Sequence, residues 1–202
     1  GTVFGVGSNE LLAAVKQIEE QGTAIPVDLP QADVMLITSV IDILLYQDAF
    51  VGSAKILNHL GVKWSLRTAG FEGANFGLLS GSEDLQKLAS KRLIDEALQI
   101  GAKIVLVPEC GHAYPAMRWD ARLDDGQPLP FEVMAVSEYV GQQIQNGNLK
   151  LTLGDSSHRV TYHDACKLAR HGGVMTEPRT ALKALGVDFV DTVPTAEQNW
   201  CC

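Results

Sequence analysis

The chain has 202 residues, a net charge of −8, 46% hydrophobic residues and 20% charged residues. This length suits one large domain or two small ones with a real core. The acidic balance argues against a nucleic-acid partner, because the phosphate backbone favours clustered Lys and Arg. No apolar run reaches the roughly 18 residues needed to span a bilayer, and no signal peptide is visible. We therefore expect a cytoplasmic protein.

The first part of the chain alternates helix-like and strand-like segments. Apolar residues at helical spacing predict helices over residues 9–21, 48–60 and 83–100. Short apolar runs predict strands over residues 33–38, 62–68 and 103–107. Residues 118–130 are the most loop-like stretch and are expected to join two halves.

The second part repeats this alternation. We expect helices over residues 131–147 and 176–186, and strands over residues 158–164 and 187–193. Strands that alternate with helices predict an α/β fold. The expected architecture is two Rossmann-like βαβ halves, related by a pseudo-repeat, with mainly parallel sheets. Residues 1–120 would form the first half and residues 121–202 the second.

The four cysteines are the main candidates for chemistry. They are Cys110, Cys166, Cys201 and Cys202, with 55 residues between the first two and 34 between Cys166 and Cys201. Reduced thiolates that bind a metal are expected, because a cytosolic chain of this size rarely uses disulfides. Each position follows a predicted strand, where α/β folds place their functional residues. The fold, rather than a local C-x-x-C loop, would have to bring the thiols together.

Three motifs carry a resemblance to a known family. VTYHDACKLARHGG, with Cys-Cys after 34 residues, is similar to the cysteine-rich CCG domain of the B-type and D-type polypeptides of heterodisulfide reductase. PECGHAYPAMRW resembles the upstream cysteine loop of the same proteins. Together with the EPR that follows, these motifs look closest to the iron–sulfur catalytic subunit of the sulfite-reductase-linked membrane complex. The first half carries FEGANFG where a second Cys-Cys-Gly would stand, so it resembles a degenerate CCG half.

The resemblance implies a metal centre and its ligands. Cys166, Cys201 and Cys202 would hold a four-iron four-sulfur cluster, for which the noncubane type known in the family is one form. Cys110 would be a further ligand from the first half. His112, His163 and Asp164 would lie around the cluster, where an imidazole N–H can hydrogen-bond a cluster sulfur. The chain stops on Cys202, before the C-x-x-C of the family, so we expect a piece of a longer polypeptide.

The function implied by the resemblance is that of an oxidoreductase subunit in dissimilatory sulfur metabolism. Electrons would come from a membrane cytochrome or quinol-oxidising subunit, through an upstream ferredoxin-like domain or subunit. They would reduce a disulfide or trisulfide on a small thiol carrier protein. The chain would then lie at the cytoplasmic membrane through its partner subunits.

Other interpretations stay open at this point. The chain could be the iron–sulfur electron-transfer subunit of a lactate or glycolate oxidation system. It could also be a zinc-stabilised or metal-free α/β scaffold, since thiolates bind zinc and isolated buried cysteines are common. His163 and Asp164 could form a general-base pair, although such a pair at a strand end is more often structural. Lys167, Arg170 and His171 could offset cluster charge or lie on a solvated surface.

Overall fold

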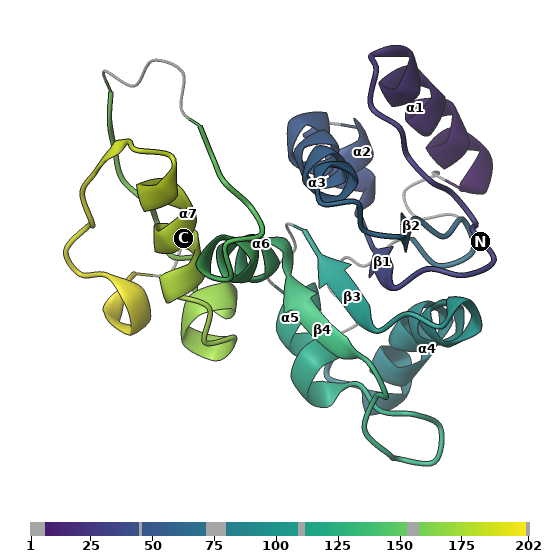
Figure 1. Ribbon diagram of the computed structural model, residues 1–202. Coiled ribbons are helices and arrows are strands. Elements are labelled where there is room, and N and C mark those ends of the chain that lie inside the picture. Colours follow the sequence, from purple (N-terminus) through teal and green to yellow (C-terminus); the bar gives the residue numbers. More distant parts are fainter. Residues whose placement is uncertain (1–6, 45, 72–79, 109–111, 153–157, 201–202) are drawn as a thin grey trace. The chain divides into compact units, whose positions relative to one another are not determined.

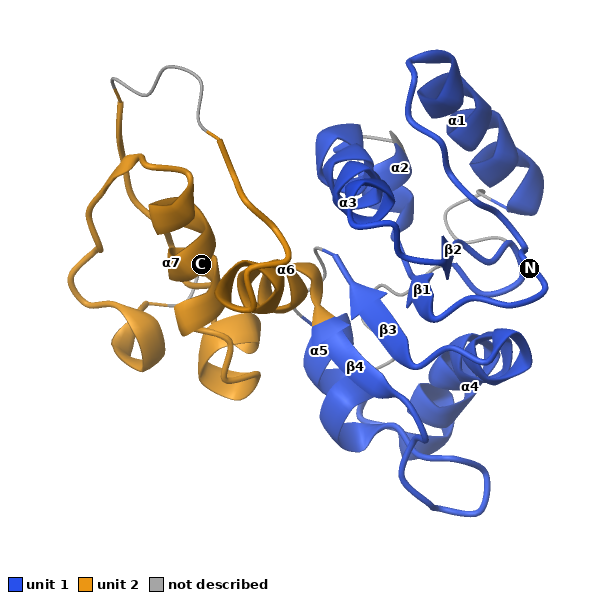
Figure 2. Ribbon diagram, in the orientation of Figure 1, with its two compact units in different colours: residues 1–134 blue, residues 135–202 orange. Residues whose placement is uncertain are grey.

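The chain folds into two compact units, residues 1–134 and 135–202 (Figure 2). The structure, a computed structural model, describes residues 7–44, 46–71, 80–108, 112–152 and 158–200. The division falls near the end of the strand Glu132–Ala135, and the predicted halves 1–120 and 121–202 stay predictions. The assignment of the first half to the CCG type stays a prediction.

Unit 1 is built on a four-stranded sheet with the order β2-β1-β3-β4 (Figure 1). Its strands are β1 (Val34–Leu36), β2 (Trp64–Ser65), β3 (Ile104–Val107) and β4 (Glu132–Ala135). β1 runs parallel to both of its neighbours. β1 and the last three residues of β3 are buried, as expected for parallel strands that are covered on both faces. The predicted α/β class with a mainly parallel sheet is confirmed.

Helices cover this sheet on both sides. They are α1 (Ser8–Glu20), α2 (Val40–Leu44), α3 (Gln47–His59), α4 (Glu83–Ile100), α5 (Ala113–Pro115) and the π-helical turn η2 (Ala116–Asp120). Figure 1 shows α1, α2 and α3 together on one side of the strands and α4 on the other. α4 has the predicted bounds because Ser82 Oγ accepts a hydrogen bond from the Leu85 N–H and Gly101 ends the helix at φ 70°.

The strand order creates a switch point between β1 and β3. The chain leaves β1 toward β2 on one side and reaches β3 on the other side. In doubly wound sheets a crevice forms where the connections diverge in this way, at the carboxyl ends of the strands. Ile37, which follows β1, donates its N–H to the carbonyl of Leu106 in β3 over 3.0 Å. From Val107 the chain runs on through Pro108 toward Cys110.

Unit 2 contains a two-stranded parallel sheet and helical segments. The strands are β5 (Arg159–Val160) and β6 (Asp188–Phe189). The helical segments are α6 (Val136–Gln145), η3 (Lys167–His171), α7 (Thr176–Ala184) and η4 (Ala196–Gln198). α6 and α7 pack closely: a Cβ atom placed on Gly141 would lie 2.5 Å from the Cβ of Glu177. Glycine is therefore the residue that lets these two backbones approach.

Two predicted segments need correction. Residues 131–147 are not one helix, because Glu132–Ala135 form β4 and the helix begins only at Val136. Glu132 donates its N–H to the carbonyl of Lys103 beside β3, so the sheet edge offers this apolar run a partner that the sequence pattern cannot reveal. The predicted loop 118–130 is also shorter, because Arg118, Trp119 and Asp120 belong to η2.

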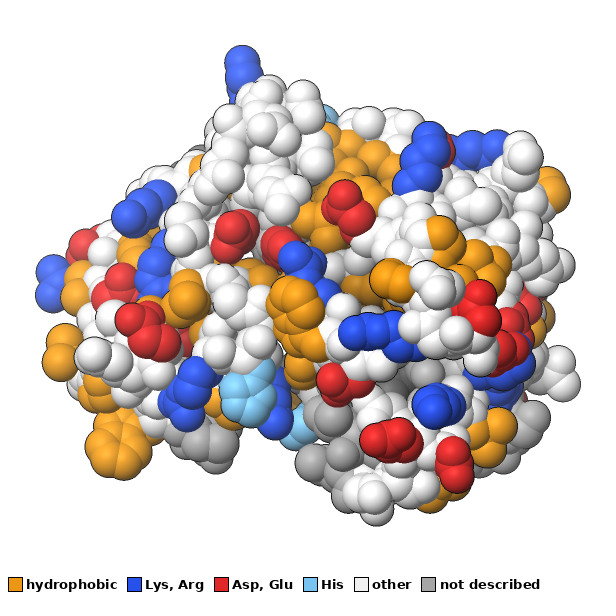
Figure 3. All heavy atoms as spheres, turned by 90° about the horizontal axis from the view of Figure 1, so that it is seen from below, with side chains coloured by type: hydrophobic (Ala, Val, Ile, Leu, Met, Phe, Trp, Pro, Cys, Tyr) orange, Lys and Arg blue, Asp and Glu red, His pale blue; other side chains and the backbone are white. Residues whose placement is uncertain are grey.

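The surface carries mixed charge. Figure 3 shows acidic and basic side chains interspersed on the face drawn, without a basic stripe there. In the described part of the chain, no helix has both the length and the apolar character needed to cross a membrane.

Candidate metal centre

Cys166 lies where the chain turns into η3. The carbonyl of the preceding Ala165 accepts hydrogen bonds from the N–H groups of Leu168 and Ala169, over 2.9 and 2.8 Å. The carbonyl of Cys166 itself accepts the N–H of His171 over 3.2 Å. The residue is half-buried. Cys166 thus occupies a position that is fixed locally, at the start of a tight turn.

Two residues before Cys166, Asp164 is buried and paired with an arginine. Its side chain is 0% exposed and that of Arg179 is 13% exposed. Nη1 and Nη2 of Arg179 donate to the two carboxylate oxygens of Asp164 over 2.8 and 2.7 Å. The Arg179 guanidinium holds the pKa of the Asp164 carboxyl below its ordinary value. Asp164 is therefore an anion engaged in a buried ion pair, and the general-base role of the His163–Asp164 pair stays a prediction.

Arg179 also holds the chain that follows β6. It donates from Nε and Nη2 to Asp191, over 2.7–3.1 Å, and from Nη2 to the Thr195 hydroxyl over 2.7 Å. The pKa of Asp191 is lowered by the same guanidinium, while the two carboxylates raise the pKa of Arg179. The Ala196 N–H donates to Asp164 Oδ2 over 2.8 Å. One arginine therefore fixes residues 191–196 against the loop that carries Cys166.

A second arginine acts closer to the cysteine pair. Arg170 of η3 donates from Nε to the Glu197 carbonyl over 3.0 Å and from Nη2 to Asn199 Oδ1 over 2.9 Å. Nη2 also bonds the Asn199 carbonyl oxygen. In return, Nδ2 of Asn199 donates to the carbonyl of Asp164. Asn199 is only 4% exposed, so its bond to the Asp164 carbonyl is buried, whereas Arg170 itself lies at the surface.

These contacts place two chain segments side by side within unit 2. Asp164 precedes Cys166 by two residues, and Asn199 precedes Cys201 by two residues. Two residues of chain reach about 7 Å at full extension. The chain therefore approaches Cys166 and the Cys201-Cys202 pair from two points that are hydrogen-bonded to each other.

The remaining predicted site residues are located as follows. Cys110, Cys201 and Cys202 lie outside the described residues, so their role as ligands stays a prediction. His112 is half-buried at the start of α5, where its carbonyl accepts the Ala116 N–H over 3.3 Å. His163 is exposed, next to the buried Asp164. The roles of His112, His163 and Asp164 around a cluster also stay predictions.

The donor chemistry fits a thiolate-bound cluster only if the cysteines act together. Among residues 7–44, 46–71, 80–108, 112–152 and 158–200, no three His, Cys, Asp or Glu side chains are grouped to hold a metal ion. Of the four cysteines, Cys166 alone lies in the part of the chain that the structure describes. The carboxylate closest to it in the chain, Asp164, is already engaged by Arg179. The described residues therefore do not form a metal site by themselves, and the thiolates of the cysteine motif, which suit iron–sulfur clusters, zinc and copper(I), stay the predicted ligands.

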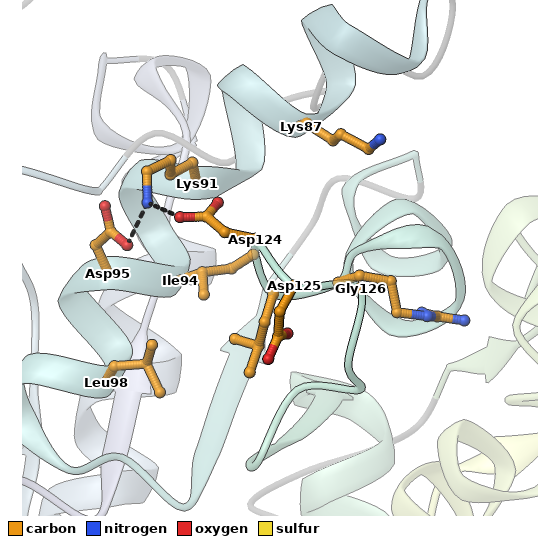
Figure 4. Close-up of a pocket in the computed structure, with 10 residues that line it drawn as sticks. Lys87, Lys91, Ile94, Asp95, Leu98, Asp124, Asp125 and Gly126 are labelled. Carbon is orange, nitrogen blue, oxygen red and sulfur yellow. Dashed lines mark hydrogen bonds and ion pairs between the residues drawn. The ribbon is translucent and has the colours of Figure 1, made fainter.

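Unit 1 carries a surface groove of its own. It has a volume of about 580 Å³ and runs between α4 and the turn at residues 122–126. Figure 4 shows Lys91 of α4 between Asp95 and Asp124, to which its Nζ is bonded over 3.0 and 2.9 Å. The groove contains none of the predicted ligands, and its charges neutralise each other.

A comparison of the sequence with protein families assigns the cysteine motif of unit 2 to a family. Residues 160–202 match the family described as "Cysteine-rich domain", CCG. These residues are a CCG domain. The CCG domain begins at Val160 in β5 and includes Cys166, both arginines of the network, Asn199 and the cysteine pair. The resemblance inferred from the motifs is confirmed for this part of the chain.

The curated relatives extend the similarity beyond the CCG domain. The D-type polypeptide of the heterodisulfide reductase of Methanosarcina mazei is 32% identical over 155 residues, 74% of this chain and 37% of the relative. An Hdr-like menaquinol oxidoreductase iron-sulfur subunit of Archaeoglobus profundus is 26% identical over 87% of this chain and 39% of the relative. The EtfAB:quinone oxidoreductase of Syntrophomonas wolfei is 30% identical over 75% of this chain and 21% of the relative. The chain thus spans well under half the length of these relatives. No solved structure matches it.

Sequence reasoning did not assign the residues that organise this region. Arg179 stands in the EPR motif and Arg170 beside the cysteine motif, but nothing in their spacing names Asp164 or Asn199 as partners. The available signal was the arginine of the EPR motif inside the CCG match, because an arginine that becomes largely buried, as Arg179 does, must pair.

Proposed function

We propose that this chain is an iron–sulfur subunit of an oxidoreductase of the heterodisulfide reductase type. The observation that carries the proposal is the pair of bonds between Arg170, Asn199 and Asp164. They join the segment that leads to Cys166 and the segment that leads to Cys201-Cys202 inside the CCG domain. The names of the relatives, which include heterodisulfide reductase and iron-sulfur subunits, support the same class.

We assign Cys166, Cys201 and Cys202 as ligands, with Cys110 as a further ligand. The expected group is a four-iron four-sulfur cluster, and the noncubane type is the finer form of this proposal. When bound, such a cluster accepts and releases single electrons and offers iron to a substrate sulfur, which no side chain does. The protein itself supplies the thiolates and sets the charge around them.

The described residues fit that task electrostatically. Thiolates bound to iron carry negative charge, and an unneutralised carboxylate nearby would add to it. Arg179 neutralises Asp164, two residues before Cys166. Lys167 and Arg170 add positive charge one and four positions after Cys166 in the chain. The turn that begins at Cys166 is therefore suited to stabilise the reduced, more negative state of a cluster.

The proposed reaction is the two-electron reduction of a disulfide or trisulfide on a small thiol carrier. For a disulfide, the S–S bond breaks, and two electrons and two protons give two thiols. A quinol supplies both and becomes a quinone, so atoms and electrons balance. The partners would be a quinol-oxidising membrane subunit and a ferredoxin-like domain or subunit, with the chain on the cytoplasmic side. We place this reaction in dissimilatory sulfur metabolism.

The first test is the cluster. The chain is purified without oxygen or reconstituted with iron and sulfide, and both elements are quantified beside ultraviolet–visible and paramagnetic-resonance spectra. We expect about four irons for a complete cluster, and Cys166→Ala should remove the spectrum. Arg159→Lys, which changes an exposed residue in the same unit, is the control and should keep it. Colourless, iron-free protein after reconstitution, or bound zinc alone, would refute the proposal.

The second test is the substrate. The iron-loaded chain, reduced with a viologen dye, is offered a small-molecule heterodisulfide and a quinone analogue in separate reactions. Thiol release that is lost in Cys166→Ala supports the disulfide reaction. The relative named EtfAB:quinone oxidoreductase supports a second candidate, an electron-transfer subunit that passes electrons to a quinone. The lactate or glycolate oxidation system is the finer form of this second proposal. Dye oxidation by the quinone without thiol release would favour that candidate instead.

A further inference from the structure

Arg170 makes three bonds to a short stretch of main chain and side chain. Its acceptors are the Glu197 carbonyl, the Asn199 carbonyl and the Asn199 side-chain oxygen. A guanidinium presents its N–H groups in a rigid planar fork, so bonds to several acceptors fix both distance and orientation. A flexible side chain with one charged nitrogen cannot reproduce this arrangement.

Asn199 closes a ring with the loop that carries Cys166. Its Nδ2 donates to the Asp164 carbonyl, the chain runs from Asp164 through Cys166 to Arg170, and Arg170 returns to Asn199. No metal takes part in these bonds. Asp164 is held independently by Arg179, so the ring is anchored on one side by a buried ion pair.

We propose that Arg170 and Asn199 are positioning residues, which hold the chain before Cys201-Cys202 against the Cys166 loop before any metal is bound. We call this pair the Arg170–Asn199 clamp. The proposal rests on the proposed function in so far as these thiols are cluster ligands. The clamp lowers the entropy that the site must lose when the ligands gather around iron, since two of the approaching segments are already joined.

The test measures thiol proximity without a cluster. Phenylarsine oxide bonds two thiols to one arsenic and releases one water, so it binds tightly only where two thiols can reach the same atom. The parent is the full chain with Cys110→Ser and Cys202→Ser, which leaves Cys166 and Cys201. We expect one tight equivalent of the arsenical in this parent. Arg170→Lys should weaken its binding about tenfold or more, because the fork is lost.

Two further variants separate positioning from folding. Asn199→Asp keeps an acceptor for Arg170 but removes the donor to the Asp164 carbonyl, and it should also weaken arsenical binding. Arg159→Lys changes an arginine of the exposed pair with Asp188 in the same unit, and it should bind like the parent. The melting temperature of each variant is measured in parallel. Arsenical binding is compared among the variants whose melting temperature equals that of the parent.

A second readout concerns the wild-type cysteines. In the iron-loaded chain, Arg170→Lys should speed the release of iron to a chelator about tenfold relative to Arg159→Lys. If the wild-type chain takes up no iron, the proposed function fails, while the arsenical measurement still decides on the clamp. Equal arsenical binding by the parent, Arg170→Lys and Asn199→Asp would overturn the clamp, as would an absence of tight binding in the parent.

Discussion

Nη1 and Nη2 of Arg179 donate to the two carboxylate oxygens of Asp164, at 2.8 and 2.7 Å, and the carboxylate is fully buried. The same guanidinium reaches Asp191 and Thr195 and lies 5.8 Å from the centre of the Tyr162 ring. It thus connects the end of the predicted strand 158–164, the helix α7 and the segment after β6. In unit 2, this ion pair is the anchor on which the Cys166 loop depends.

Replacing Asp164 by Asn should unfold or strongly destabilise unit 2. The amide cannot accept two charge-assisted bonds, and it leaves Arg179 facing a neutral group in a buried position. Breaking a buried pair by removing one partner costs about 3–5 kcal/mol. Urea unfolding followed by circular dichroism measures the loss. The matched control is Asp188→Asn, in the exposed pair with Arg159, where we expect less than about 1 kcal/mol; equal losses in the two variants would contradict the buried anchor.

The same carboxylates predict how stability depends on pH. The folded-state pKa of Asp164 and of Asp191 is lowered by Arg179, whereas an unfolded Asp titrates near about 4. The stabilisation is therefore complete above about pH 4 to 5 and is lost as the pH falls through the folded-state pKa values. The free energy of unfolding should be compared for the wild type and Asp164→Asn from pH 7 to pH 2. The difference between the two free energies of unfolding should become smaller only as the pH falls. A difference that becomes smaller as the pH rises would contradict a lowered folded-state pKa of Asp164.

Gly141 sets the distance between α6 and α7. Alanine there would bring its Cβ within 2.5 Å of the Glu177 Cβ and 2.7 Å of its Cα. Because the obstacle includes backbone, the helices must separate, which costs about 1–3 kcal/mol as overpacking does. Gly52 in the middle of α3 has open space around it, so Gly52→Ala should instead stabilise by about 0.5–1 kcal/mol. Thermal unfolding should show a lower melting temperature for Gly141→Ala and a higher one for Gly52→Ala than for the wild type. A Gly141→Ala variant as stable as the wild type would show that α6 and α7 are not in such close contact.

A second buried pair supports unit 1. Arg67, just after β2, donates from Nε to Glu96 of α4 over 2.6 Å, with side chains 10% and 13% exposed. It also donates to the Leu29 carbonyl over 3.1 Å. Glu96→Gln should cost about 1.5–3 kcal/mol, the range for charge-assisted bonds. The adjacent Asp95→Asn, in an exposed pair with Lys91, should cost less than about 0.5 kcal/mol. Denaturant unfolding of Glu96→Gln and Asp95→Asn measures the two losses in the free energy of unfolding. Similar losses in the two variants would argue against a buried role for Glu96.

The sequence determined most of the local structure because its signals are local. α4 was predicted with its observed bounds, since Ser82 and Gly101 mark a helix start and end whatever surrounds them. The predicted strands β1 and β3 also lie in the expected places. The helix predicted over 131–147 was wrong at its start, because a short apolar run such as 131–135 becomes a strand when a sheet edge is available beside it.

The cysteine motif likewise identified the CCG domain from the sequence alone, because three thiols at a fixed spacing, with their flanking residues, are a linear pattern. Only the tertiary structure decided how that motif is supported. Arg179 and Asp164 are 15 residues apart, and Arg170 and Asn199 are 29 apart. Hydrogen bonds between such distant residues depend on where the whole chain brings them, which no spacing rule records. The sequence therefore named the candidate ligands, and the fold revealed the two arginines that bring their segments together.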